Sequence, residues 1–283
     1  MIDLPRIVAI LTIHNRRDQT LVCLERLFKQ AGFNTEYRLT AVVVDDGSTD
    51  GSSDAILERF AERVELIQSD GSLFWARGMN LAEHRARVSE PDMILWLNDD
   101  VVLDTDAIQR SVDLCAAHDG EAIIVGAMRS STTGPTTYSG STLRSRRPGS
   151  LVQVEPKSTP QLVDTFNGNF VLVPRRVYRK LDPVRIEFSH AYGDIDYGLR
   201  AKRDGIQSIL GAGYSGVCAS NSIDGTWLDV NMVRRRRIHL LFSRKGYPIR
   251  SHVVFNTSHG GWLWPIYFVS TYVKAFARIL VRK

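Results

Sequence analysis

The sequence predicts an α/β fold built on a mostly parallel β-sheet. Three observations carry this prediction. Short apolar runs recur along the first half of the chain, segments with apolar residues at helical spacing separate them, and polar turn residues stand at the boundaries. Strands that alternate with helices pair in parallel, and the helices cover the faces of the sheet. A chain of 283 residues with 43% hydrophobic residues is long enough to bury such a core.

The predicted elements alternate over the first hundred residues. Each apolar run is too short for a helix and is bounded by turn residues, which favours a strand. In order, we predict strands over 7–13, 39–44, 64–67 and 93–97, with helices around 21–28, 55–60 and 75–88 between them.

The pattern loosens in the second half of the chain. Ser, Thr, Gly and Pro dominate residues 130–160, which predicts long loops and short antiparallel strands. A strand is predicted over 161–173, interrupted by the Asn-Gly-Asn triplet at 167–169. An acidic turn at 190–196 then leads into a helix.

The end of the chain predicts a basic, amphipathic helical tail. Arginines fill 234–237, and Lys274 and Arg278 interrupt the apolar stretch over 262–280, so that the roughly 20 uninterrupted apolar residues of a membrane span are absent. Such a helix either lies in a membrane interface or packs on the domain, and both readings stay open. Its apolar stripe consists of Ile266, Val269, Tyr272, Val273, Phe276, Ile279 and Leu280.

The net charge and the cysteines of the chain indicate which partners and which cell compartment to expect. A net charge of +5 favours a polyanionic partner such as a nucleotide diphosphate or an anionic membrane surface. We expect no nucleic acid, since the arginine run lacks a recognition motif. The cysteines, Cys23, Cys115 and Cys218, stand far apart, which fits a reducing compartment. The first residues lack the features of a signal peptide. We therefore expect a cytoplasmic protein, peripheral on the inner face of the cell membrane if the tail binds lipid.

Polar residues end three of the predicted strands. His14 and Asn15 follow the first strand, Asp45 and Asp46 end the second, and the triplet Asn-Asp-Asp at 98–100 ends the fourth. Ligands of open parallel sheets bind beyond the carboxyl ends of the strands, so one crevice can collect all three groups. Carboxylates are the ligands that Mg²⁺ and Mn²⁺ prefer. Taken alone, each segment is also an ordinary turn or helix cap.

Four segments together resemble the family 2 glycosyltransferases of GT-A fold. The resemblance implies a Rossmann-like, mostly parallel sheet flanked by helices. It also implies an enzyme that moves a sugar, with inversion, from a nucleotide-diphosphate donor to the hydroxyl of a glycan or lipid-linked acceptor, in the assembly of cell-surface glycan or glycolipid. The segments are LTIHNR at 11–16, VDDGSTDG at 44–51, LNDD at 97–100 and GDIDYGLR at 193–200.

The resemblance divides the chain into parts. The glycosyltransferase domain would span 1–229, with a nucleotide-binding half over 1–103 and an acceptor half over 104–229. The basic, amphipathic tail over 230–283 lies outside the resemblance.

The resemblance also implies a donor site at the strand ends. Asp46 would pair with the base, Asp100 would bind the Mn²⁺ or Mg²⁺ that bridges the diphosphate, and Asp99 would contact ribose or metal. Asn98 stands where the family more usually has Asp, and a neutral amide there would alter the ribose contact or weaken the binding of the ion. Arg77, in WARGMN at 75–80, either offsets phosphate charge or is a surface arginine. The implied nucleotide-binding residues are Thr12, His14, Asn15, Asp46, Arg77, Asn98 and Asp99.

The implied general base is Asp194. An inverting transfer needs a base within hydrogen-bond reach of the attacking hydroxyl, and the family's acidic pair is usually Glu-Asp. Gly193 stands at the Glu position and Asp194 at that of the base. Asp196 is the competing choice, or it pairs with Arg200 one helical turn later.

The acceptor side is less closely defined by the resemblance. Many relatives carry a metal-binding His some two dozen residues beyond the base, where this chain has Cys218, so the third protein ligand stays open. For Trp227, packing in a core is an equally good account. The residues that we expect on the acceptor or sugar side are Trp75, Asn169, Asp196 and Trp227.

Three other functions are weighed against transfer. A dinucleotide oxidoreductase would show GxGxxG after the first strand, and this chain does not. A nucleotidyltransferase of related architecture would carry a glycine-rich basic loop there. A non-catalytic nucleotide-sugar-binding protein is suggested by the departures at Asn98, Gly193 and Cys218.

Overall fold

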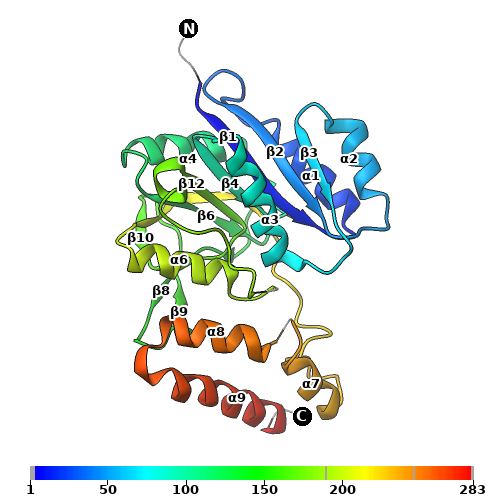
Figure 1. The fold of residues 1–283 in the computed structure, drawn as a ribbon, viewed down its shortest axis with the longest axis vertical. Coiled ribbons are helices and arrows are strands. Elements are labelled where there is room, and N and C mark those ends of the chain that lie inside the picture. Colours follow the sequence, from blue (N-terminus) through cyan, green and yellow to red (C-terminus); the bar gives the residue numbers. More distant parts are fainter. Residues whose placement is uncertain (1–3, 189, 245, 282–283) are drawn as a thin grey trace.

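The computed structural model describes residues 4–188, 190–244 and 246–281, and it confirms the α/β fold (Figure 1). Residues 1–3, on which the signal-peptide argument partly rests, lie outside the described residues. The described part of the main sheet has the order β10-β13-β6-β12-β4-β1-β2-β3, with β5 beside β13 and β7 beside β6. Its strands are β1 (Arg6–Ile13), β2 (Arg38–Asp45), β3 (Val64–Gln68), β4 (Met93–Leu97), β5 (Val102–Leu103), β6 (Ile123–Arg129), β7 (Thr136–Tyr138), β10 (Gln161–Val163), β12 (Phe170–Pro174) and β13 (Ser208–Val217).

The first four strands are parallel, as their spacing predicted. In the register of β1 and β2, Ile13 lies opposite Asp45, so both strands end at the same level. On the other side of β1, β4 places Trp96 opposite Ile10. The loops after β1, β2 and β4 therefore emerge from neighbouring strands at one edge of the sheet, which is where ligands of such sheets bind.

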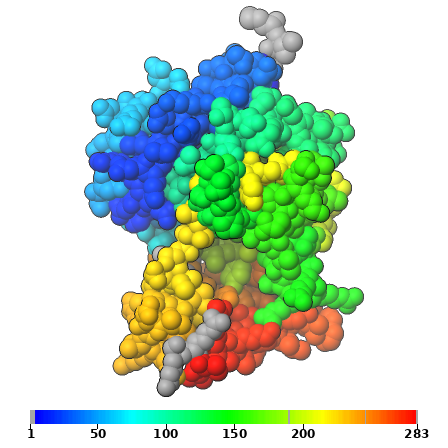
Figure 2. Space-filling model, turned by 180° about the vertical axis from the view of Figure 1, so that it is seen from behind, coloured from blue at the N-terminus to red at the C-terminus, as the bar shows by residue number. Residues whose placement is uncertain are grey.

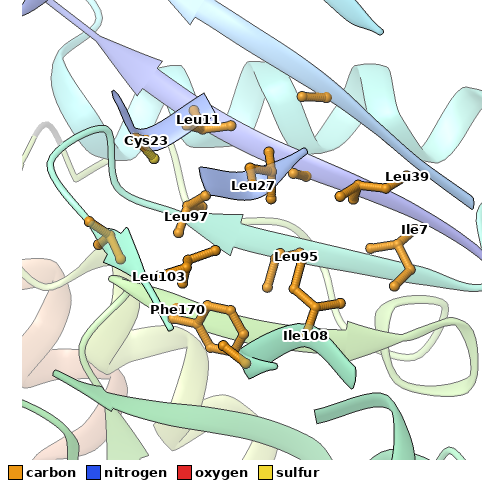
Figure 3. Packing of buried hydrophobic residues seen from close by; sticks show 14 of the residues in the cluster. Ile7, Leu11, Cys23, Leu27, Leu39, Leu95, Leu97, Leu103, Ile108 and Phe170 are labelled. Atoms are coloured by element: carbon orange, nitrogen blue, oxygen red, sulfur yellow. The ribbon is translucent and has the colours of Figure 1, made fainter. Parts of the chain in front are cut away.

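Helices cover both faces of the sheet because successive strand residues point to opposite sides. Ile7, Ala9 and Leu11 of β1 pack on the face covered by α1, α2 and α4 (Figure 3). Val8 and Ile10 pack on the face covered by α3, α5 and α6. The helices are α1 (Arg17–Leu27), α2 (Ser52–Phe60), α3 (Phe74–Val88), α4 (Ala107–Ala116), α5 (Arg175–Tyr178) and α6 (Gly193–Arg203).

The strand predicted over 161–173 is instead divided among β10, β11 and β12. β10 pairs with β13 and β12 lies antiparallel between β4 and β6, while β11 joins a separate three-stranded sheet. The turn at 167–169 allows this change of sheet, because it lets the chain leave β11 and enter the core beside β4. The strands of the small sheet are β8 (Gly140–Leu143), β9 (Leu151–Gln153) and β11 (Thr165–Phe166).

The tail folds as several helices rather than one, and we name residues 234–281 the C-terminal helical unit. It lies below the sheet in Figure 1, next to α6. Seen from behind in Figure 2, the molecule is hollowed between the sheet and this unit, and the floor of the hollow has the yellow-green colour of the segment that contains α6. Its elements are α7 (Arg234–Leu241), α8 (Ile249–His259), η1 (Gly261–Leu263) and α9 (Trp264–Val281).

The apolar stripe of α9 divides between two faces. Ala275 and Ile279 are buried against α7 and Trp227, with Tyr272 and Phe276 beside them. Six other apolar side chains of the helix and of the turn before it are exposed to solvent. They are Trp262, Ile266, Val269, Val273, Leu280 and Val281. No helix among the described residues is long and apolar enough to cross a membrane.

Candidate active site

The loops after β1 and β2 are joined by short hydrogen bonds. The backbone N–H of Asn15 donates to Ser48 Oγ at 2.9 Å, and Thr49 N–H donates to Asn15 Oδ1 at 2.8 Å. His14 Nδ1 lies 2.7 Å from the backbone oxygen of Asp46, so this nitrogen carries the ring proton. His14 and Asn15 remain exposed. Their polar groups therefore border the edge of the sheet where the strands end.

Asp46 is buried and holds the start of α3. Its carboxylate accepts Ser69 Oγ–H at 2.8 Å, Leu73 N–H at 3.0 Å and Phe74 N–H at 2.7 Å. These backbone donors belong to the helix N-terminus, where an acidic side chain is favoured. Both carboxylate oxygens are thus engaged within the protein. Whether Asp46 also pairs with a nucleotide base stays a proposal.

Two carboxylates at the end of β4 share one arginine. Arg16 Nη1 lies 3.2 Å from Asp99 Oδ1 and 3.0 Å from Asp100 Oδ2. Burial raises the pKa of Asp99 to about 6, although the charge of Arg16 opposes this shift. Asp100 is the more exposed of the two carboxylates. The two carboxylates thus share the positive charge of Arg16.

These residues suit a hard divalent cation only in part. Within the described residues, no three His, Cys, Asp or Glu side chains are grouped to hold a metal ion. Cys218 donates its thiol to Asp100 at 3.4 Å, and burial raises the pKa of this thiol, so it stays protonated. However, Mg²⁺ is commonly held by one or two carboxylates together with phosphate oxygens. Asp100 and Asp99 fit that manner of binding.

Trp75 connects this acidic end to α6. Its indole N–H donates to Asn98 Oδ1 at 2.8 Å. A Cβ atom on Gly168 would lie 2.5 Å from the Trp75 ring, and one on Gly193 would lie 3.3 Å from it. Gly168 is therefore required by space, since any side chain there would displace the indole, while Gly193 packs closely on Val184 and Ala76 as well as on the indole. This packing brings the start of α6 beside the Asn98 amide.

Asp194 stands in the first turn of α6. Its Oδ2 accepts the Gly168 N–H at 3.0 Å, and its Oδ1 accepts the Ile195 N–H at 2.8 Å. Burial raises the pKa of Asp194, and the backbone donors oppose this shift only in part. A carboxylate with a raised pKa that still accepts hydrogen bonds is suited to take up a proton.

The sequence profile of Glycosyl transferase family 2 matches residues 8–182. This chain belongs to that family. The chain is a glycosyltransferase by its family, and this confirms the resemblance carried by its motifs. No curated protein sequence matches it.

Solved structures share the fold of this family 2 glycosyltransferase at low sequence identity. The mannosyltransferase PcManGT from Pyrobaculum calidifontis, in complex with GDP-Man and Mn²⁺, is 17% identical with a TM-score of 0.57, over 99% of this chain and 74% of its own. GalNAc-T7 with UDP, GalNAc and Mn²⁺ is 10% identical with a TM-score of 0.60, and the match covers 74% of this chain and 42% of GalNAc-T7. S. aureus TarS is 16% identical with a TM-score of 0.56, and the match covers 91% of this chain and 44% of TarS. The chain thus spans less than half of GalNAc-T7 and of TarS.

Three residues that we expected on the acceptor side of this glycosyltransferase are buried in the structure. The Asp196 side chain is fully buried and pairs with Arg200, which is the structural alternative. Asn169 is buried, and its amide is directed at Cys218. Trp227 lies in the core of the C-terminal helical unit, where Tyr247 packs on its ring. None of these side chains is open to a sugar, because each is already enclosed by protein.

Two predicted donor-side residues also point elsewhere. Arg77 Nε donates to the backbone oxygen of Ile186 at 3.0 Å, and it lines a groove of about 490 Å³ together with Arg250. Arg77 and Trp75 are two residues apart on α3 and therefore do not share a face of the helix. The hydroxyl of Thr12 is buried close to Gly78 of α3 and has no hydrogen-bond partner among the described residues.

Sequence reasoning missed two residues of the site. Arg16 lies in the first motif, but nothing in the motif said that its guanidinium reaches Asp99 and Asp100. His259 lies in α8, and its Nε2 is 2.8 Å from Asp196. A positive charge directly after the first strand was the only signal for Arg16. No local signal pointed to His259.

Proposed function

We propose that this glycosyltransferase acts with inversion and that Asp194 is its general base. One observation carries the proposal. Trp75 donates to Asn98 and packs on Gly168, and the Gly168 N–H donates to Asp194. The acidic end of β4, where a donor diphosphate would lie, is therefore linked to the candidate base through one side chain and one backbone group. Such an arrangement suits a donor and an acceptor held face to face.

In this proposal the transfer is a single displacement. The acceptor hydroxyl oxygen attacks the anomeric carbon, and the bond between that carbon and the diphosphate oxygen breaks. The hydroxyl proton passes to Asp194, and the nucleoside diphosphate leaves with the bonding electron pair. The configuration at the anomeric carbon is inverted because attack and departure occur on opposite faces. The raised pKa of Asp194 favours the proton transfer.

The donor side of the proposal rests on polar groups at the strand ends. The exposed His14 and Asn15 would contact the nucleotide, and Asn98 and the buried Asp99 would lie near the ribose. Asp100, with Asp99, would hold Mn²⁺ or Mg²⁺. When bound, the cation neutralises charge on the departing diphosphate. The complexes of PcManGT and GalNAc-T7 with Mn²⁺ support a divalent cation in this fold.

The substrate class follows from the family and from the neighbouring structures. GDP-Man and UDP occupy similar folds, so the proposed donor is a nucleoside-diphosphate hexose or deoxyhexose. The proposed acceptor is a glycan or a lipid-linked glycan of cell-surface assembly. We also propose that residues 1–103 bind the donor, residues 104–229 bind the acceptor, and residues 230–283 attach the enzyme.

The exposed stripe of α9 supports attachment to an anionic membrane surface on the cytoplasmic side. Trp262 is 85% exposed at the start of the stripe, and Lys274 flanks it. An apolar stripe with flanking cations lies in a lipid interface. The arginine run contributes less than its sequence predicted, because Arg237 is buried and Arg234 donates to the backbone oxygen of Leu280 at 3.0 Å.

Flotation with liposomes tests the attachment. We expect the chain to float with vesicles of phosphatidylglycerol and phosphatidylcholine, and the double variant Ile266→Ser and Val269→Ser to stay at the bottom. Val88→Ser is the matched control, since Val88 is also exposed but lies far from α9. Equal flotation of all three proteins would disprove attachment through this stripe.

A donor screen tests the transfer itself. Uridine, thymidine and guanosine diphosphate sugars are offered with Mn²⁺, and the product is examined by NMR. We expect one donor to give a product whose anomeric configuration is opposite to that of the donor. Retained configuration would contradict the single displacement. Donor binding without transfer or hydrolysis would favour the non-catalytic nucleotide-sugar-binding protein.

A further inference from the structure

Helix α8 packs on the turn that opens α6. Tyr192, the residue before α6, stacks on Phe255 of α8 with ring centroids 4.6 Å apart and an interplanar angle of 22°. Tyr192 also lies parallel to the ring of His252, at 6.0 Å. Phe255 is buried in the same apolar cluster as the α3 and α6 side chains. The C-terminal helical unit is thus continuous with the core under the proposed base.

The backbone at Tyr192 is in a conformation that needs support. Its φ is 75°, in the left-handed region that L residues with large side chains rarely adopt. Such a strained conformation persists only where the surroundings enforce it. Among the described residues, the rings of Phe255 and His252 of α8 pack on Tyr192, and Phe188 lies 6.3 Å from it. The turn that presents Asp194 therefore depends in part on a helix far along the chain.

A second contact between α8 and α6 involves His259. Its Nε2 lies 2.8 Å from Asp196 Oδ1, while Arg200 Nε lies 2.8 Å from Asp196 Oδ2. Arg185 approaches the same carboxylate at 3.4 Å and donates to Ser258 of α8 at 2.8 Å. Each oxygen of Asp196 thus has its own donor. His259 is the one that arrives from outside the predicted catalytic domain.

The carboxylate of Asp196 is buried, so it needs hydrogen-bond donors from the protein. The carboxylate has no exposed surface. Burial alone would raise the pKa of Asp196, but the hydrogen bond from His259 and the charge of Arg200 together hold it below its usual value. Without His259, Oδ1 of this buried carboxylate would keep only the more distant Arg185, at 3.4 Å, and it would shift toward a nearer donor, because a buried oxygen that lacks a good hydrogen bond is costly. Asp196 is two residues from Asp194, so such a movement would reach the base.

We propose that His259, through Asp196, is a positioning residue that holds the Asp194 carboxylate in its working orientation. The C-terminal helical unit is then a required part of the transferase and not only its attachment to a surface. This inference rests on the proposed role of Asp194. It assigns to α8 a task that neither the motifs nor the family match over residues 8–182 includes.

The test compares His259→Ala and His259→Gln in the full-length chain. We expect His259→Ala to lower kcat by roughly 10- to 100-fold with little change in donor KM, because the base is misplaced while the donor side is intact. His259→Gln restores most of kcat, since its amide N–H still donates to Asp196. His239→Ala is the control, because His239 is exposed on α7. Wild-type kcat in His259→Ala would overturn the proposal.

Hydrogen exchange of the same proteins provides a measurement that does not need activity. In His259→Ala, amides at 192–196 should exchange at least tenfold faster, while those of β1 and β4 keep their rates. Faster exchange throughout the sheet would indicate general destabilisation and would contradict a positioning role. If wild type transfers no sugar from any donor, the proposed function fails, and the exchange result still judges the contact between α8 and α6.

A further pair of variants covers the case in which His259→Ala does not fold. His259→Phe keeps a ring beside Phe255, which lies 5.2 Å from the His259 ring, but it cannot donate to Asp196. We expect His259→Gln to be active and His259→Phe to have a kcat lower by an order of magnitude or more. Equal kcat values in the two variants would overturn the proposal.

Discussion

The guanidinium of Arg16 lies 3.0 Å from the carboxylate of Asp100 and also contacts Asp99. One positive charge thus already serves the two acidic groups at the end of β4. A divalent cation held by the same carboxylates would compete with it. Arg16 is 42% exposed in its side chain, so it is free to turn toward solvent or toward a bound diphosphate.

Removal of Arg16 should therefore tighten the binding of Mn²⁺ in the absence of nucleotide. We expect Arg16→Gln to lower the Mn²⁺ Kd about fivefold, as suits the loss of a partly exposed ion pair worth about 1 kcal/mol. Calorimetry of the nucleotide-free protein measures this. Arg17→Gln is the control, because Arg17 pairs with the exposed Asp18 and not, among the described residues, with Asp99 or Asp100. Unchanged or weaker Mn²⁺ binding in Arg16→Gln would mean that these carboxylates do not bind the cation.

Gly168 should not tolerate a side chain. The Cβ of Gly168→Ala would meet the Trp75 ring at 2.5 Å, so the indole must move away from Asn98. We expect a loss of transfer activity of at least roughly tenfold and a change in tryptophan fluorescence. Gly149→Ala is the matched control, since nothing lies within 4 Å of its added Cβ. Full activity in Gly168→Ala would show that the position of the Trp75 ring does not contribute to transfer.

Asp46 should contribute strongly to stability, whatever its contact with the donor. Asp46→Ala removes the acceptor for three donors at the start of α3. In Asp46→Ala we expect the free energy of unfolding, measured in urea, to fall by roughly 2–4 kcal/mol. In Asp46→Asn it should fall by less, because the amide keeps one acceptor oxygen. Asp70→Ala, at an exposed turn, is the control. A loss under 1 kcal/mol in Asp46→Ala would show that the cap is dispensable.

His252 should make stability depend on pH. Burial lowers the pKa of His252 to about 4, from an ordinary value of 6.5. The stabilisation is therefore present above pH 6.5, and it is lost as the pH falls toward 4, because the unfolded chain takes up a proton that the folded protein does not. The free energy of unfolding in urea should decrease between pH 7.5 and pH 5.0, and this decrease should be larger by roughly 2 kcal/mol in wild type than in His252→Phe. An equal decrease in the two proteins would contradict the lowered pKa of His252.

The parallel half of the fold could be predicted because its signals are local. Each of the first four strands is a short apolar run ending in polar residues, and the register of β1, β2 and β4 then follows from parallel pairing. The same logic placed Asp46, Asp99 and Asp100 at strand ends. The division of 161–173 among three strands was missed, since pairing of β11 with β8 depends on partners distant in the chain.

The acceptor side could not be predicted because burial depends on tertiary packing. Trp227 and Asp196 are both chemically suited to bind a sugar, and the sequence does not reveal that other segments enclose them. Trp227 is enclosed by helices α7 and α9, and Asp196 by Arg200 and His259. His259 is 63 residues from Asp196. Contacts at that separation leave no pattern in one sequence.

The central claim is that Asp194 takes the proton of the acceptor hydroxyl, and single-turnover transfer by Asp194→Asn tests it most directly. We expect the rate to fall by roughly 10²- to 10⁴-fold while the donor Kd is unchanged, because an amide cannot accept the proton. In wild type the rate should decline as the pH falls through the raised pKa of Asp194, above the ordinary value of 3.8. A wild-type rate in Asp194→Asn would contradict the account.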